Sequence, residues 1–146
     1  MKVVHFLCLI LSSISTASYA VLGELNSANN ARNLTLKSTS DSNATVRFQV
    51  QNDNSVTIKE YVGADGIVYA VTWHGPRPPD LITLLGKYFP EYSAAKARTP
   101  LRIPRRGLTA TSLNLQINQF GHPGSLRGLI YLKDKLPANI HPEDLQ

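Results

Sequence analysis

Apolar and polar residues alternate with a period of two in several short runs of the chain. The clearest runs are residues 46–50, 56–62 and 67–74, and the last two flank the sequence "GADG". A period of two is typical of β-strands that bury one face, and a glycine-rich tetrapeptide between two such runs is typical of a hairpin turn. The pattern therefore predicts one strand followed by a β-hairpin.

The hairpin turn also predicts which residues face each other. With Ala64 and Asp65 as the central turn residues, the expected cross-strand partners are Val62 with Ile67, Ile58 with Val71, Val56 with Trp73, and Glu60 with Tyr69. One face of the hairpin is then aliphatic and aromatic. Glu60 is expected on that same face.

A helical pattern follows the hairpin. The prolines of "GPRPP" end the strand, and Pro79 and Asp80 suit the start of a helix. One apolar stripe at helical spacing consists of Leu81, Leu84, Leu85, Tyr88 and Tyr92. Because Pro90 disfavours helical geometry in the residue before it, we expect a break at Phe89, with "EYSAAKAR" as a second helical piece.

Two more strands are expected near the C-terminus. "TSLNLQIN" alternates, with Leu113, Leu115 and Ile117 on one side, and "LRGLIYL" follows a turn at residues 121–124. The tail "LPANIHPEDLQ" is too short and interrupted for an element of its own. The sequence therefore predicts an α+β domain, an antiparallel β-sheet of about five strands in the order βββ-α-ββ with a helix packed on one face.

The first residues have the features of an export signal. Lys2 precedes an apolar run of about nine residues and a small-residue ending at Ala20, and such a run is far below the roughly 20 residues that span a bilayer. We expect a signal peptide at 1–20, a polar N-terminal arm at 21–45 and a single domain at 46–146. The protein is then periplasmic or secreted, without a transmembrane segment after processing.

Processing also removes the single cysteine, Cys8. The mature chain then has no thiol, which excludes disulfides, thiolate catalysis and cysteine metal sites. The formal net charge of +5 falls to +4 when Lys2 is removed.

The stretch "EYVGADGIVYAVTWHGPRPPDLITLLGKYFPEY" resembles the central signature of a family of small exported bacterial proteins known as domain of unknown function 2844. The pairs "LG" after the cleavage site and "GH", "GLIYL", "LP" and "EDLQ" near the end extend the similarity over most of the mature chain. The resemblance implies an exported, single-domain protein. It implies no activity, cofactor or catalytic residue.

Positive charge is concentrated in one segment. The basic residues of "AAKARTPLRIPRRG" are Lys96, Arg98, Arg102, Arg105 and Arg106, and no acidic residue lies between Glu91 and Asp134. Outside the cytoplasm, such a segment could bind an anionic envelope polymer or another envelope protein, or could be an exposed proline-rich loop.

Three further polar residues are candidates for a functional or structural role. Glu60 is expected on an apolar face, and His74 ends a strand six residues before Asp80. A buried carboxylate needs hydrogen-bond donors, so a structural pairing with Arg, Lys or a Tyr hydroxyl is the simpler interpretation of Glu60. The aromatic residues Trp73, Tyr88, Phe89 and Tyr92 are expected to fill the core.

Several chemistries lack their sequence motifs. There is no zinc-type histidine spacing, no phosphate-binding glycine loop, and "GSLRG" departs from the G-x-S-x-G nucleophile motif. We therefore expect no nucleotide, metal or cofactor. Two functions remain open: a non-enzymatic accessory or binding module of the envelope, and a small envelope hydrolase that uses His74, Asp80 or Glu60.

Overall fold

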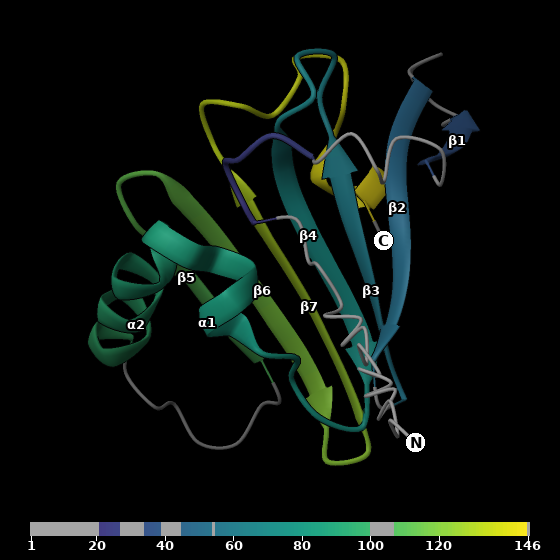
Figure 1. Cartoon of the computed structure of the whole chain (residues 1–146). Helices are drawn as coiled ribbons and strands as arrows, with labels where there is room; N and C mark the ends of the chain where they lie inside the picture. Colours follow the sequence, from purple (N-terminus) through teal and green to yellow (C-terminus); the bar gives the residue numbers. More distant parts are fainter. Residues whose placement is uncertain (1–20, 27–33, 39–44, 54, 100–106, 146) are drawn as a thin grey trace, which may run out of the picture.

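The computed structural model of the chain describes residues 21–26, 34–38, 45–53, 55–99 and 107–145. Within these residues, seven antiparallel strands form one sheet in the spatial order β1-β2-β3-β4-β7-β6-β5 (Figure 1). The strands are β1 (Leu34–Ser38), β2 (Thr45–Asp53), β3 (Val56–Val62), β4 (Val68–Gly75), β5 (Gly107–Thr111), β6 (Leu115–His122) and β7 (Ser125–Leu132). Two meanders, β1 to β4 and β5 to β7, therefore meet where β4 pairs with β7.

The helical segments lie between the two meanders and at the C-terminus. They are α1 (Leu81–Leu85), the 3-10 turn η2 (Gly86–Tyr88), α2 (Phe89–Arg98) and the 3-10 turn η3 (Pro142–Leu145). In Figure 1, α1 and α2 lie together over the β5–β6 side of the sheet, and η3 lies near β2 and β3.

The predicted class, an antiparallel α+β domain, is confirmed, but the predicted strand number and order are wrong. Among the described residues, the observed order is four strands, two α-helices and three strands. The alternation of apolar and polar residues does not predict β1 and β5 because both are five-residue edge strands. Edge strands bury little surface, so they need no regular apolar face.

The helix begins where the sequence predicts it, but breaks earlier. Asp80 is the N-cap of α1, and its carboxylate accepts hydrogen bonds from the backbone of Ile82 and Thr83. The break falls at Gly86, where φ is 48°, and not at Phe89, which is helical. Pro90 lies in the first turn of α2, where its missing N–H is tolerated.

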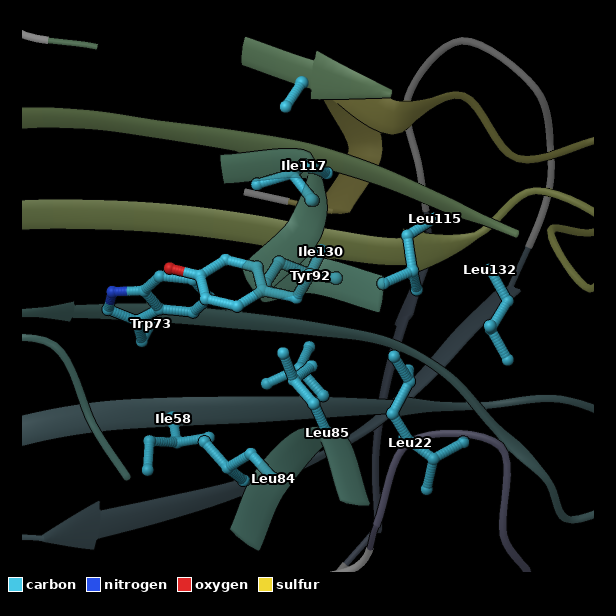
Figure 2. Packing of buried hydrophobic residues seen from close by; sticks show 14 of the residues in the cluster. Leu22, Ile58, Trp73, Leu84, Leu85, Tyr92, Leu115, Ile117, Ile130 and Leu132 are labelled. Carbon is cyan, nitrogen blue, oxygen red and sulfur yellow. The ribbon is translucent and has the colours of Figure 1, made fainter. Parts of the chain in front are cut away.

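The larger core lies between the helices and one face of the sheet, and we term it the helix-side core. Its buried side chains include Leu84, Leu85 and Tyr92 from the helical segments and Ile58, Trp73, Leu115, Ile117, Ile130 and Leu132 from the strands (Figure 2). The expected core role of Trp73 and Tyr92 is confirmed, while Tyr88 and Phe89 are partly buried against the same cluster. Leu113 was expected beside Leu115 but is 85% exposed in the turn before β6.

The opposite face of the sheet has a smaller core, which we term the tail-side core. Its members are Phe48, Tyr61, Tyr69, Ala70, Leu129, Ile140 and Leu145. The Tyr61 hydroxyl donates a hydrogen bond of 2.6 Å to the Leu145 carbonyl oxygen. The C-terminal tail, for which no element was expected, is therefore anchored to the sheet through η3.

The predicted hairpin register is wrong by one residue at Val62, next to the turn, and by two residues at Glu60 and Ile58. Ile58 pairs with Trp73, and Glu60 pairs with Val71. Near the turn, Tyr61 pairs with Ala70 while Val62 pairs with Val68, so Tyr69 is an extra residue in β4. This β-bulge turns the Tyr69 side chain to the tail-side core, 6.3 Å from the Tyr61 ring, and away from the face that Glu60 occupies.

Part of the stretch expected to be a polar arm contributes to the fold. Leu22 is fully buried in the helix-side core, and its backbone N–H donates to the Leu84 carbonyl. The expected signal peptide, residues 1–20, lies outside the described residues. Of the helices that the structure describes, none has the length and apolar character needed to cross a membrane.

Candidate functional site

A groove lies on the tail-side face of the sheet, beside the part that the C-terminal tail covers. We term it the open groove. It has a volume of about 200 Å³, and the side chains that define it are Thr57, Lys59, Thr72, His74, Phe120 and Arg127. All six point to the same face, because each belongs to the strand positions that alternate with the helix-side core.

The pairing of β4 with β7 brings the groove together. Thr57 of β3 faces His74 of β4, His74 faces Arg127 of β7, and Arg127 faces Phe120 of β6. Cross-strand partners have Cβ atoms about 5 Å apart. A continuous row therefore crosses four strands, with an imidazole and a guanidinium at its centre and an aromatic ring at one end.

Positive charge dominates the groove. Lys59 and Arg127 carry fixed charges, and no acidic residue is among the described residues that line the groove. The Lys59 ammonium lies 5.4 Å from the centroid of the Phe48 ring, which holds it at the side of the groove toward β2. Two lining residues, Thr72 and Leu129, are buried and form the floor of the groove. The exposed lining residues around them are His74, Phe120 and Arg127.

Thr72 links the floor of the groove to the C-terminal tail. Its side chain forms a hydrogen bond with the Tyr61 hydroxyl, which donates to the Leu145 carbonyl oxygen. Burial raises the pKa of the Tyr61 hydroxyl, and the hydrogen bond with Thr72 acts in the opposite direction. Tyr61 therefore stays protonated and available as a donor to the tail at neutral pH.

The three polar candidates from the sequence do not meet at one site. Glu60 is fully buried on the helix side of β3, between Ile58 and Val62, whereas His74 is exposed on the opposite face. Asp80 caps α1: its carboxylate accepts a 2.6 Å hydrogen bond from the Thr83 hydroxyl and a 3.0 Å hydrogen bond from the Ile82 N–H. The hydrogen bonds from Thr83 lower the pKa of Asp80, so it is ionised at neutral pH.

The remaining candidates lie away from the open groove or outside the described residues. Lys96 and Arg98 are exposed in the last turn of α2. Arg102, Arg105 and Arg106 lie outside the described residues. His122 is exposed at the β6–β7 turn, where its Nδ1 lies 3.0 Å from the Pro123 carbonyl oxygen. Among the described residues, no group of three or more His, Cys, Asp or Glu side chains is placed to hold a metal ion.

The relationship suggested by the central signature can now be tested. Comparison with protein-family models finds a match to "Protein of unknown function (DUF2844)" over residues 18–145. The chain belongs to this family. No curated protein and no solved structure matches the DUF2844 chain. The expected family is therefore confirmed, and its description assigns no activity to the open groove.

The sequence of this DUF2844 chain did not indicate Lys59, Phe120 or Arg127 as site residues. One signal was available for Lys59: it alternates with the apolar residues of β3, so it had to lie on the same hairpin face as His74. No such signal existed for Arg127. Its position beside His74 depends on pairing between strands about 50 residues apart in the chain, which local periodicity does not specify.

Glu60 is a fully buried carboxyl residue whose role can be tested directly. On the interpretation of Glu60 as a paired structural carboxylate, we expect Glu60→Gln to lower the free energy of unfolding by about 1 to 3 kcal/mol, because a charge-assisted hydrogen bond in a buried setting would be replaced by a weaker neutral one. Urea denaturation measures the change. Glu143→Gln, at an exposed position, is the control and should change stability by less than about 0.5 kcal/mol. An unchanged unfolding curve for Glu60→Gln together with lost ligand binding would instead assign Glu60 a functional role.

Proposed function

We propose that this protein is an exported, non-enzymatic binding module of the cell envelope that holds an anionic partner in the open groove. The observation that carries the proposal is the placement of Lys59, His74 and Arg127 around one depression whose described lining has no acidic residue. Partners of negative charge are favoured at such a surface, and positively charged partners are repelled.

The charge of the whole chain supports the same class of partner. The formal net charge is +5, and the described part of the basic segment adds Lys96 and Arg98 at the end of α2. Export is supported by the sequence of residues 1–20, which matches the pattern of a signal peptide. A polyanion of the envelope is therefore the partner class that best fits both the compartment and the charge.

The hydrolase hypothesis has weaker support. Glu60 is buried on the helix side of the sheet, His74 lies on the other face, and the Asp80 carboxylate is engaged as a helix cap. A general acid and a general base must both reach the same substrate, so these three residues would need a rearrangement of the sheet to act together.

Salt dependence of binding tests the proposal. The probe is dextran sulfate, and affinity is measured at several salt concentrations by calorimetry. Each cation that contacts a dense polyanion contributes up to about one unit to the log-log slope. We expect the open-groove variant Lys59→Gln/Arg127→Gln to lose about two units of slope and at least about tenfold in affinity.

Two controls separate the open groove from overall charge. Lys87→Gln/Lys135→Gln removes the same number of charges from exposed positions elsewhere and should change affinity by less than threefold. Arg102→Gln/Arg105→Gln/Arg106→Gln tests the basic segment. If only the basic-segment variant loses binding, the partner binds there and not in the open groove. If the wild-type affinity does not depend on salt, an anionic partner is excluded.

A further inference from the structure

The open groove presents an aromatic ring to solvent. Phe120 is 39% exposed, and among the described residues it is the one aromatic side chain in the set of exposed large hydrophobic residues. The other aromatic residues near the sheet, such as Trp73 and Tyr61, are buried in one of the two cores. An exposed aromatic ring beside a polar depression offers an apolar surface against which the apolar face of a ligand can pack.

A guanidinium lies next to this ring. Phe120 and Arg127 are direct cross-strand partners in the β6–β7 pair, so their side chains leave the same face about 5 Å apart. The cation–π contacts among the described residues join Lys59 to Phe48 and Lys87 to Tyr88, and none joins Arg127 to Phe120. Phe120 and Arg127 are both exposed, so the ring and the guanidinium are accessible to a ligand.

The size of the open groove limits what can enter it. A volume of about 200 Å³ is somewhat larger than a cavity of about 150 Å³ that holds one benzene molecule. One six-membered ring with a substituent fits this space. The row from Thr57 to Phe120 spans three inter-strand spacings, or about 14 Å, so the row of side chains is longer than one ring.

The side chains around the groove select the chemistry of that ring. Arg127 can bind a carboxylate through two parallel hydrogen bonds. The His74 ring nitrogens and the acceptor lone pairs of Thr57, whose hydroxyl donates to the Asn52 side chain, offer polar groups that a purely aromatic acid would leave unpaired, at an energetic cost. Ring hydroxyl groups would satisfy them, while the apolar face of a sugar can pack on Phe120.

We propose that the open groove binds a uronic acid ring of an acidic polysaccharide, with the carboxylate on Arg127 and the apolar face of the sugar on Phe120. This inference rests on the proposed binding function and names its ligand class. The neighbouring rings of the polymer extend along the row of side chains, toward Lys59 at one side and beyond Phe120 at the other.

A galacturonic acid trimer is a suitable probe, because its methyl ester has the same rings without the charge. Binding in the groove is followed by chemical-shift changes of the Phe120 and Arg127 backbone amides, because the ring of the single tryptophan, Trp73, lies in the helix-side core on the opposite face of the sheet. We expect the acid trimer to bind at least tenfold more tightly than its methyl ester, than the monosaccharide and than benzoate. Calorimetry provides an independent affinity.

Variants separate the two contacts. Phe120→Ala should lower affinity for the trimer about tenfold without changing the salt slope, whereas Arg127→Gln should abolish the preference for the acid over the ester. Leu113→Ala, at another exposed apolar position outside the groove, is the matched control and should leave affinity unchanged. All variants are first compared with the wild type by thermal unfolding.

The possible results distinguish this inference from the proposed function. If benzoate or the methyl ester binds as tightly as the acid trimer, the uronic acid inference is wrong. If the trimer does not bind while dextran sulfate binding still depends on Lys59 and Arg127, the inference fails and the proposed function stands. If neither probe depends on the groove residues, both are wrong.

Discussion

Trp73→Ala is expected to lower the free energy of unfolding by about 3 to 5 kcal/mol, the usual effect of removing a large buried aromatic side chain. Trp73 is 4% exposed and belongs to the helix-side core, where helix residues such as Tyr92 and strand residues such as Ile58 surround it. Its removal leaves a cavity between the helices and the sheet that the neighbouring side chains fill only in part. Urea denaturation measures the loss.

Two comparisons make the Trp73 result specific. Trp73→Phe should recover part of the lost stability, because it retains an aromatic ring in the same core. Phe120→Ala removes an aromatic side chain from the exposed face and should cost less than about 1 kcal/mol. Equal losses for Trp73→Ala and Phe120→Ala would contradict the assignment of Trp73 to the core and Phe120 to the surface.

Gly128→Ala is expected to lower the free energy of unfolding by about 3 kcal/mol, near the upper end of the usual effect of adding a methyl group to a packed core. Gly128 faces Trp73 across the β4–β7 pair, and a Cβ atom at Gly128 would overlap with Cζ2 of the indole ring. The ring is buried, so it can yield only by disturbing the helix-side core. Thermal or urea unfolding measures the effect.

The contact between Gly128 and Trp73 can be isolated with a double-mutant cycle. In a Trp73→Ala background the clash disappears, and Gly128→Ala should become neutral or stabilise by up to about 1 kcal/mol, because alanine loses less backbone entropy than glycine on folding. A Gly128→Ala effect that is the same in both backgrounds would show that the indole ring does not lie over Gly128.

Local sequence signals predicted the elements around this contact well. Alternation placed the β3–β4 hairpin strands to within about one residue, and Pro79 with Asp80 marked the start of α1. These signals work because each depends on neighbours within a few positions of the chain. The sequence did not predict the helix break at Gly86, because Pro90 indicated a break at Phe89 more strongly. Proline is nevertheless tolerated in the first turn of a helix, where Pro90 lies.

Local signals could not predict the register of the hairpin or which strands pair with each other. The extra residue at Tyr69 shifts all pairs beyond it, and its position is decided by packing of the Tyr69 ring near Tyr61 in the tail-side core. The C-terminal tail was judged too short for structure, yet Ile140 and Leu145 are buried because β2 and β3 provide a surface for them. Tertiary contacts decided these features.

The candidate site also depends on tertiary contacts between strands far apart in the chain. His74 was recognised as a candidate from its place at a strand end, but only the pairing of β4 with β7 and β7 with β6 places Arg127 and Phe120 beside it. Glu60 was expected on an apolar face, and it is buried there, apart from His74. The basic segment gave a stronger sequence signal than the open groove because its charges are consecutive in the chain.

Residue-resolved NMR during titration with a short dextran sulfate oligomer tests the open groove as the binding surface most directly. The account predicts that the backbone amides with the largest chemical-shift changes are those of Lys59, His74, Phe120 and Arg127, on four different strands that meet only in the folded sheet. Amides of the same strands at the helix-side core should change little. If the changes instead concentrate at Lys96, Arg98 and the residues that follow them, while the groove amides stay unchanged, the open groove is not the binding site.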